Sequence, residues 1–244
     1  MVLFLMVIPV VAAASEAPPV DAGELHGSAY TLLEGTTRIG LNTEVAHGFR
    51  PGLQAGTRVL QWAKGPNAWL EWSFRDSGSS AWALSSTFDL ERDGEYVYSH
   101  SIRHTMGPRD GSRVSVGLGW WEALDDSQMW TAYGSYTVRT RYGGLFVPVG
   151  VDLVAGRHTI QLQGGVMPVV SDLDDSLLLG EVELDQVTWN AGAWWATGWK
   201  VFRMSAGVTA SSHVSDDYAR LMHGLGLDVP EVEVAPRLRL WWAF

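Results

Sequence analysis

The chain has 244 residues, a formal net charge of -10, 13 tryptophans and no cysteine. This length fits a single barrel or sandwich domain, or two smaller domains. The acidic balance argues against nucleic acid as a partner, because binding phosphate requires a basic face. The fold cannot depend on disulfides, and we find no cofactor motif and no convincing metal-ligand spacing.

The first stretch, residues 2–11, is apolar but too short to cross a bilayer as a helix. Ala12, Ala13 and Ala14 follow it as a small-residue cleavage pattern. We therefore expect residues 1–14 to be a secretory signal peptide, with a buried N-terminal strand as the alternative. The basic region usual in such leaders is missing, which leaves open a start upstream of Met1. Residues 15–35 have no clear period, and we interpret them as a periplasmic lead-in.

From Thr36 onward, strand-length segments of alternating polarity are separated by clusters of Gly, Asp, Ser and Pro. The clearest apolar faces comprise Ile39, Leu41 and Val45; Leu70, Trp72 and Phe74; Trp82, Leu84 and Phe88; Val114, Val116, Leu118 and Trp120; Leu145, Val147, Val149 and Val151; and Val187, Trp189 and Ala191. Residues 53–62, 96–104 and 199–210 are strands by composition, without a clear register. The count is about 12 strands, or about 10 if residues 96–121 are divided differently.

The connections alternate between short and long. The two longest, residues 171–185 and 211–231, are expected on the outer side, and the tight links at 91–94, 155–157 and 196–198 on the periplasmic side. Pro148 and Pro236 fall inside proposed strands, where we predict bulges because proline removes a ladder donor. The acidic loop at 172–175 lacks the spacing of a calcium loop.

The last strand begins near Val232. From Pro236 onward its apolar residues fall on every second position, Leu238, Leu240, Trp242 and Phe244, while Arg237 and Arg239 take the other face. This strand resembles the closing strand of bacterial outer-membrane β-barrels. The resemblance implies that Leu240, Trp242 and Phe244 form the signal read by the outer-membrane assembly machinery, with membrane lipid and lipopolysaccharide as further partners.

Two features favour such a barrel over a soluble exported sandwich, in which the tryptophans would fill the core. The polar strand faces hold small residues and several arginines instead of lysine and glutamate. Trp and Tyr also gather near strand ends, as in the aromatic girdles of membrane barrels. We predict an all-β fold with a single antiparallel transmembrane β-barrel over residues 36–244, located in the bacterial outer membrane.

The alternation assigns a charged set to the inner faces of the strands. This set comprises Arg38, Glu44, Glu71, Arg75, Arg113, Arg139, Arg141, Asp152, Arg237 and Arg239. An arginine-rich lumen predicts a small porin-like channel for small anionic solutes, since rings of charge set selectivity. Alternatively, the arginines pair with acids across strands and brace a filled interior, as in a structural or adhesive barrel with a plugged lumen.

A lipid-modifying enzyme barrel is the remaining alternative. Its best cluster is Ser99, His100, Ser101 and His104. Neighbouring residues of a strand point to opposite faces, so His100 cannot simply pair with Ser101, whereas His100 and His104 share a face. The sequence therefore favours a barrel without catalytic residues, cofactor or metal.

Overall fold

The computed structural model describes residues 20–244 apart from 26, 42–43, 64, 91–94, 132–133, 170–185, 213–221, 223 and 225–229, and it describes residues 125–142, 169 and 186 by backbone alone. The predicted signal peptide, residues 1–14, and the acidic loop at 172–175 lie outside the described residues.

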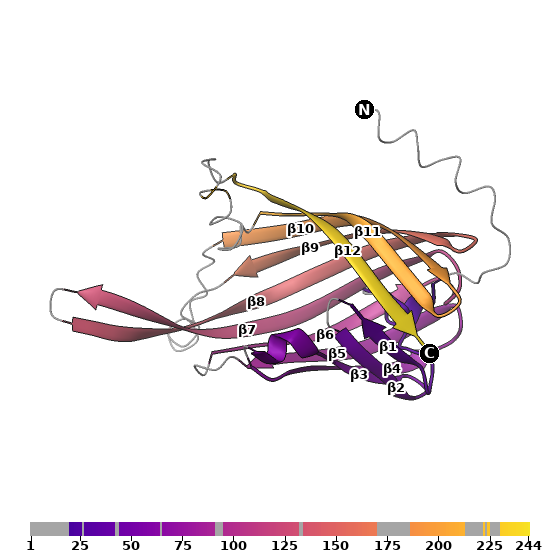
Figure 1. The fold of residues 1–244 in the computed structure, drawn as a ribbon, viewed down its shortest axis with the longest axis horizontal. Coiled ribbons are helices and arrows are strands. Elements are labelled where there is room, and N and C mark those ends of the chain that lie inside the picture. The colour runs from indigo at the N-terminus through magenta and orange to yellow at the C-terminus, as the bar shows by residue number, and fades with distance from the viewer. Residues whose placement is uncertain are drawn as a thin grey trace.

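Twelve antiparallel strands follow one another around a closed ring in chain order, and the ring closes where the first strand pairs with the last (Figure 1). They are β1 (Thr37–Gly40), β2 (Glu44–Arg50), β3 (Leu53–Arg58), β4 (Asn67–Asp76), β5 (Ser80–Leu90), β6 (Tyr96–Met106), β7 (Arg113–Thr131), β8 (Gly134–Ala155), β9 (His158–Val169), β10 (Gln186–Trp199), β11 (Phe202–Ser211) and β12 (Glu233–Ala243). Two 3-10 turns, η3 (Ala22–Glu24) and η4 (Val59–Ala63), complete the described elements. The predicted all-β barrel of about 12 strands is confirmed, and the ten-strand alternative is excluded.

The strands bury their polar faces and expose their apolar ones. In β4, Leu70 and Trp72 are 47% and 46% exposed, while the alternating residues Glu71 and Ser73 are each 8% exposed. A sandwich would show the opposite distribution, because its core is apolar. The barrel therefore has a polar interior and an apolar outer surface, as a barrel surrounded by lipid requires. Within the described part of the chain, no helix has the length and apolar character needed to cross a membrane.

The two ends of the barrel differ. The short links at 51–52, 77–79, 107–112, 156–157 and 200–201 lie at the end that holds Phe244, which we call the turn end. The strand ends joined by 170–185 and by 212–232 lie at the opposite, loop end, so the two longest connections share one end as predicted. The link at 91–94 was expected beside 155–157 but joins strands at the loop end, because consecutive antiparallel links alternate between ends. Residues 196–198 are part of β10, and the turn follows at Lys200, whose φ of 52° is left-handed.

Strands β7 and β8 extend beyond their neighbours. Strand β6 follows β7 only to Leu124, and β9 joins β8 only from Val147. Beyond these positions the two strands pair with each other alone, forming a hairpin that projects from the loop end (Figure 1).

Neither proline produces the predicted bulge. At Pro148 the β7–β8 pairing is interrupted between Val116↔Val149 and Gly119↔Phe146, with the same register on both sides. Pro236 pairs in unbroken register with Val208. The bulges occur instead between Gly48 and Arg50 in β2 and between Ser73 and Arg75 in β4.

Pro236 is tolerated because its missing N–H points away from β11. The N–H of Ala243 donates to Val201 at the start of β11, whereas the N–H of Phe244 donates to Thr37 on the opposite side. Backbone N–H groups alternate along a strand, so the nitrogen of Pro236 faces the β1 side. Strand β1 has already ended there, at Gly40 opposite Trp241, and no ladder bond is lost.

The described residues of 20–33, which we call the inner segment, lie inside the barrel except for Leu33, which is 56% exposed. Tyr30 and Ala29 pack against Ala81 and Ala83 of β5. Val20 and Leu25 pack against Ala196 of β10 and Trp241 of β12. These strands stand on different sides of the ring, so a segment that touches all of them crosses the lumen. Part of the stretch expected as a periplasmic lead-in is therefore an internal element.

Candidate functional site: the barrel lumen

Hydrogen bonds fix the inner segment to the turn end of the wall. The N–H of Ala29 donates to Oγ1 of Thr105 at 2.8 Å, and the hydroxyl of Tyr30 donates to the carbonyl of Gly107 at 2.7 Å. The side chain of Tyr30 is only 1% exposed, so its ring is fully buried inside the barrel. Because Gly107 belongs to the β6–β7 link, these bonds anchor the inner segment at the turn end of the lumen.

Ion pairs add to this closure. Arg109 donates from Nε and Nη2 to the two carboxylate oxygens of Asp21, at 2.6 Å and 2.7 Å. Glu24 lies 3.2 Å from Nε of Arg203 and accepts a hydrogen bond of 3.0 Å from the indole of Trp241. Bidentate pairs of this kind specify geometry as well as adding energy.

Burial raises the pKa of Glu24 above its ordinary value, and this cause outweighs the opposing effects of Arg203 and of the hydrogen bond from Trp241. Asp21 raises the same pKa and Arg38 lowers it, both to a smaller extent. Docking of the inner segment is therefore linked to the protonation of Glu24.

A second buried pair braces the wall beside the inner segment. Nε of Arg113 lies 2.7 Å from Oδ2 of Asp152, and Gln161 donates to the other carboxylate oxygen at 3.0 Å. Arg113 is 3% exposed and Asp152 6%. Both residues lie on the inner face as the alternation predicts, but at the turn end, where they brace the wall instead of meeting solvent.

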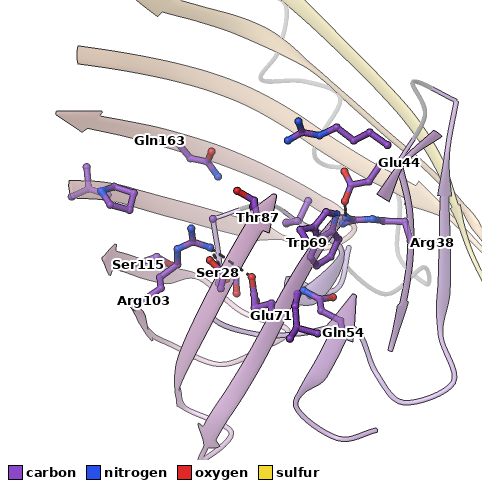
Figure 2. A pocket seen from close by; sticks show the side chains of 18 of the residues that line it. Ser28, Arg38, Glu44, Gln54, Trp69, Glu71, Thr87, Arg103, Ser115 and Gln163 are labelled. Carbon is purple, nitrogen blue, oxygen red and sulfur yellow. Dashed lines mark hydrogen bonds and ion pairs between the residues drawn. The ribbon is translucent and has the colours of Figure 1, made fainter. Parts of the chain in front are cut away.

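Above the inner segment the lumen is hollow. One cavity of about 320 Å³ is floored by Gly23, Leu25, Gly27 and Ser28 of the segment and reaches across the ring to Gln163. Figure 2 shows Arg38, Glu44, Glu71 and Arg103 around it. Arg38 forms an ion pair with Glu44 and donates to the carbonyl of Glu24, while Arg103 lies 4.0 Å from Glu71.

A second cavity, of about 580 Å³, adjoins the first on the side of β12. Its charged lining consists of Glu24, Arg38, Glu44, Arg58, Arg237 and Arg239. Among the described residues, Arg237 donates to Oγ1 of Thr209 at 3.3 Å, and Arg239 interacts electrostatically with Glu44 without an ion pair between them. This part of the lumen therefore carries net positive charge.

One predicted lumen arginine, Arg75, is placed elsewhere. The bulge after Ser73 pairs Arg75 with Trp82, which belongs to the outer face of β5. Because directly paired residues share a face, Arg75 lies on the outside at the turn end. Arg139 and Arg141 belong to the projecting β7–β8 hairpin, and their side chains lie outside the described residues.

Arg58 is a lumen residue that sequence reasoning missed. The register of residues 53–62 was left open, and in the structure β3 ends at Arg58 and passes into η4. Arg58 lines both cavities and lies 3.7 Å from Asp89.

Four of the tryptophans assigned to membrane girdles face inward. Trp69 lines the first cavity, and Trp241 lines the second, donating to Glu24. Trp194 is paired across the strands with Gln161, which faces inward, so Trp194 faces inward too. Trp121 is paired with Ser99, and the hydroxyl of Ser99 is hydrogen-bonded to that of Thr87, which lines the first cavity. Trp121 therefore also faces inward. In a pair of adjacent tryptophans, alternation sends one ring inward and the other outward. The girdle therefore has fewer members than the sequence suggested.

The serine and histidine cluster does not assemble as a catalytic group. The hydroxyls of Ser99 and Ser101 face inward and bond to hydroxyls on β5. His100 faces outward, where its Nδ1 lies 2.8 Å from Oγ of Ser86, a pair that the sequence did not reveal. Ser86 lies opposite Leu70 of β4 on one side and opposite His100 of β6 on the other. The backbone N–H groups around Ser86 therefore donate to the neighbouring strands of the sheet. An oxyanion would find no backbone donor at this position.

The described residues contain no group of three or more His, Cys, Asp and Glu side chains placed to hold a metal ion. Leu240, Trp242 and Phe244 alternate along β12 on its outer face, and Phe244 is 62% exposed.

No protein-family model matches the chain, and no curated protein is similar to it at a significant level. The fold itself, a closed antiparallel barrel of 12 strands that is polar inside and apolar outside, is compatible with the class of outer-membrane β-barrels.

Proposed function

We propose that the protein is an outer-membrane barrel of the porin-like class, whose arginine-lined lumen takes up small anionic solutes. The observation that supports this most is the charge of the larger cavity. Four arginines and two glutamates line it, and one of those glutamates, Glu24, already has a partner in Arg203. Fixed positive charge that faces water favours anions over cations.

The inner segment makes the lumen a gated one. With residues 20–33 in place, the turn end, which is the periplasmic end of an outer-membrane barrel, is closed. Solutes then enter from the loop end and stop at the segment, and passage requires the segment to move. The same closure also favours the second candidate function, a structural or adhesive barrel with a permanently plugged lumen.

Ion selectivity in planar bilayers distinguishes the two candidates. The channel hypothesis expects current steps that favour anions. In the double variant Arg237→Gln/Arg239→Gln, the ratio of anion to cation permeability should fall about fivefold, corresponding to about 1 kcal/mol of lost attraction. Arg75→Gln is the matched control, because it removes the same charge from the outer face.

A full-length protein that gives no current at any voltage would favour the plugged structural barrel. Current steps that favour cations, or equal selectivity in the double variant and the wild type, would contradict the assignment of the lumen arginines.

A further inference from the structure

The first cavity, which the inner segment floors, contains an indole ring among polar groups. Trp69 of β4 is half-buried and lines this cavity beside Glu71, two residues further along the same strand (Figure 2). Its ring lies over Gly56, the residue opposite it on β3, where an added Cβ would come within 2.7 Å of two ring atoms. Glycine at this position therefore lets the ring pack against the wall, and the rest of the indole faces the cavity.

Two buried side chains beside the ring have unused hydrogen-bonding atoms. Glu71 is 8% exposed, and Nη1 of Arg103 on β6 lies 4.0 Å from its Oε2. The amide of Gln54 also interacts with this carboxylate. Even so, Oε1 of Glu71 and Nε of Arg103 have no hydrogen-bond partner among the residues that the structure describes. An open acceptor and an open donor in neighbouring side chains fit a ligand hydroxyl, which donates to one and accepts from the other.

The chemistry of this lining fits a sugar ring. A pyranose has a face of C–H groups that packs against an indole, because the face of the indole carries the negative part of its quadrupole. The hydroxyls of the sugar both donate and accept, as Glu71 and Arg103 require. A size of about 320 Å³ lies at the lower end of the range for small-molecule sites and suits a single ring.

The charges of this cavity favour an acidic sugar over a neutral one. Three arginines and two glutamates line it. The glutamates balance two of the arginines, in the pair of Arg38 with Glu44 and in the contact of Arg103 described above. The excess positive charge is that of Arg58, which lines both cavities. Arg58 is 3.7 Å from Asp89 and both side chains are partly hydrated, so a ligand carboxylate can reach the guanidinium group.

We infer that the first cavity binds a single acidic sugar, such as a hexuronate. The sugar ring lies on Trp69, and its hydroxyls form hydrogen bonds with Glu71 and Arg103. Its carboxylate faces Arg58. This inference rests on the proposed uptake of small anions and names their chemical class. Because the inner segment floors the site, a sugar that enters from the loop end binds there before it passes the segment.

Calorimetric titration of the full chain in detergent micelles tests the inference. Three probes of similar size separate recognition of charge from recognition of hydroxyls. Glucuronate has both, methyl glucoside has hydroxyls without charge, and cyclohexanecarboxylate has charge without hydroxyls. We expect glucuronate to bind at least tenfold more tightly than either of the others, since a site with buried polar groups rejects a ligand that leaves them unpaired.

Two variants locate the site. Trp69→Ala removes the surface under the sugar ring and should weaken glucuronate binding about tenfold. Trp72→Ala is the matched control, because Trp72 lies on the same strand but on the outer face, where it is 46% exposed, and its loss should leave binding unchanged. Glu71→Gln keeps the volume of the side chain and should also weaken glucuronate binding about tenfold.

The comparison of the three probes on the wild-type protein keeps the test valid if the variants fold poorly. Equal affinity for glucuronate and for either of the other probes would overturn the inference. Glucuronate binding that is unchanged in folded Trp69→Ala and Glu71→Gln would also overturn it, because the sugar would then bind elsewhere.

The bilayer experiment separates this failure from failure of the proposed function. Anion-selective current together with equal affinity for glucuronate and cyclohexanecarboxylate would leave the channel in place and remove the sugar site. Preferential binding of glucuronate by a barrel that passes no current would support the sugar site and contradict the channel.

Discussion

The two ends of the lumen treat charge differently. At the turn end each buried arginine has an acid, as in Arg113 with Asp152 and Arg203 with Glu24. Farther from the turn end, in the middle of β12, Arg237 and Arg239 are exposed to the lumen, and neither forms an ion pair with a described carboxylate. Burying an unpaired charge is costly, whereas a charge that remains hydrated needs no partner. The paired end is therefore the structural end, and the hydrated end keeps its charge for a ligand.

The largest expected effect is on the open fraction of the channel when the inner segment is removed from the turn end. Burial of Leu25, Tyr30 and Leu32 contributes about 1.5–3 kcal/mol for each side chain. A deletion of residues 22–33 should therefore raise the open fraction of the channel by more than about a hundredfold, measured as mean current through planar bilayers.

The deletion variant must first be shown to form a barrel, by its resistance to unfolding in detergent at room temperature. A folded deletion variant with the same current as the wild type would mean that the segment does not close the lumen.

The next effect in size separates buried pairs from hydrated ones. Asp152→Asn leaves the buried Arg113 without a carboxylate, and the free energy of unfolding should fall by about 3–5 kcal/mol. Asp89→Asn is the matched control, because its partner Arg58 is 3.7 Å away and both side chains are partly hydrated, at 47% and 35% exposure for Arg58 and Asp89. That variant should cost no more than about 1 kcal/mol. Urea unfolding in lipid vesicles measures both, and equal losses would remove the distinction between the two ends.

The wall of the barrel was predictable because a strand between lipid and lumen has a strict period of two. In β4, alternation alone assigned Leu70 and Trp72 to the outside and Glu71 to the lumen, as the structure has them. Alternation failed at Arg75, because a bulge changes the face of every residue after it and depends on the partner strand. It also could not separate inward tryptophans from those of the girdle.

The inner segment was not predictable for a different reason. The described residues of 20–33 form a single 3-10 turn, η3, and their remaining order comes from contacts with seven strands, β1, β3, β5, β6, β10, β11 and β12. A segment without regular structure has no hydrophobic period that sequence reasoning can detect.

The pH dependence of closure depends on Glu24. Because its pKa is raised when the segment is docked, protonation favours the docked state. The stability that protonated Glu24 adds to the docked state is fully present at a pH below 4.5, the ordinary pKa of a glutamate. It is lost as the pH rises through the raised pKa of Glu24 in the docked segment. The open fraction should therefore increase with pH across that window, by bilayer recording from acidic to neutral pH. Glu24→Gln should abolish the dependence, while Glu34→Gln, at an exposed position of the same stretch, should keep it. If the open fraction of Glu24→Gln still depends on pH, a group other than Glu24 is responsible for the pH dependence.

The smallest expected effect concerns one hydroxyl of the inner segment. Tyr30→Phe removes the donor to the carbonyl of Gly107 and keeps the buried ring, so docking should weaken by about 1 kcal/mol, or about fivefold in the open fraction. Tyr98→Phe is the control, because Tyr98 donates to Glu122 on the outer face and does not touch the segment. Single-channel open probability measures both variants. If Tyr98→Phe opens the channel as much as Tyr30→Phe, loss of a tyrosine hydroxyl acts on the barrel as a whole, and the turn end is not closed by the contact with Gly107.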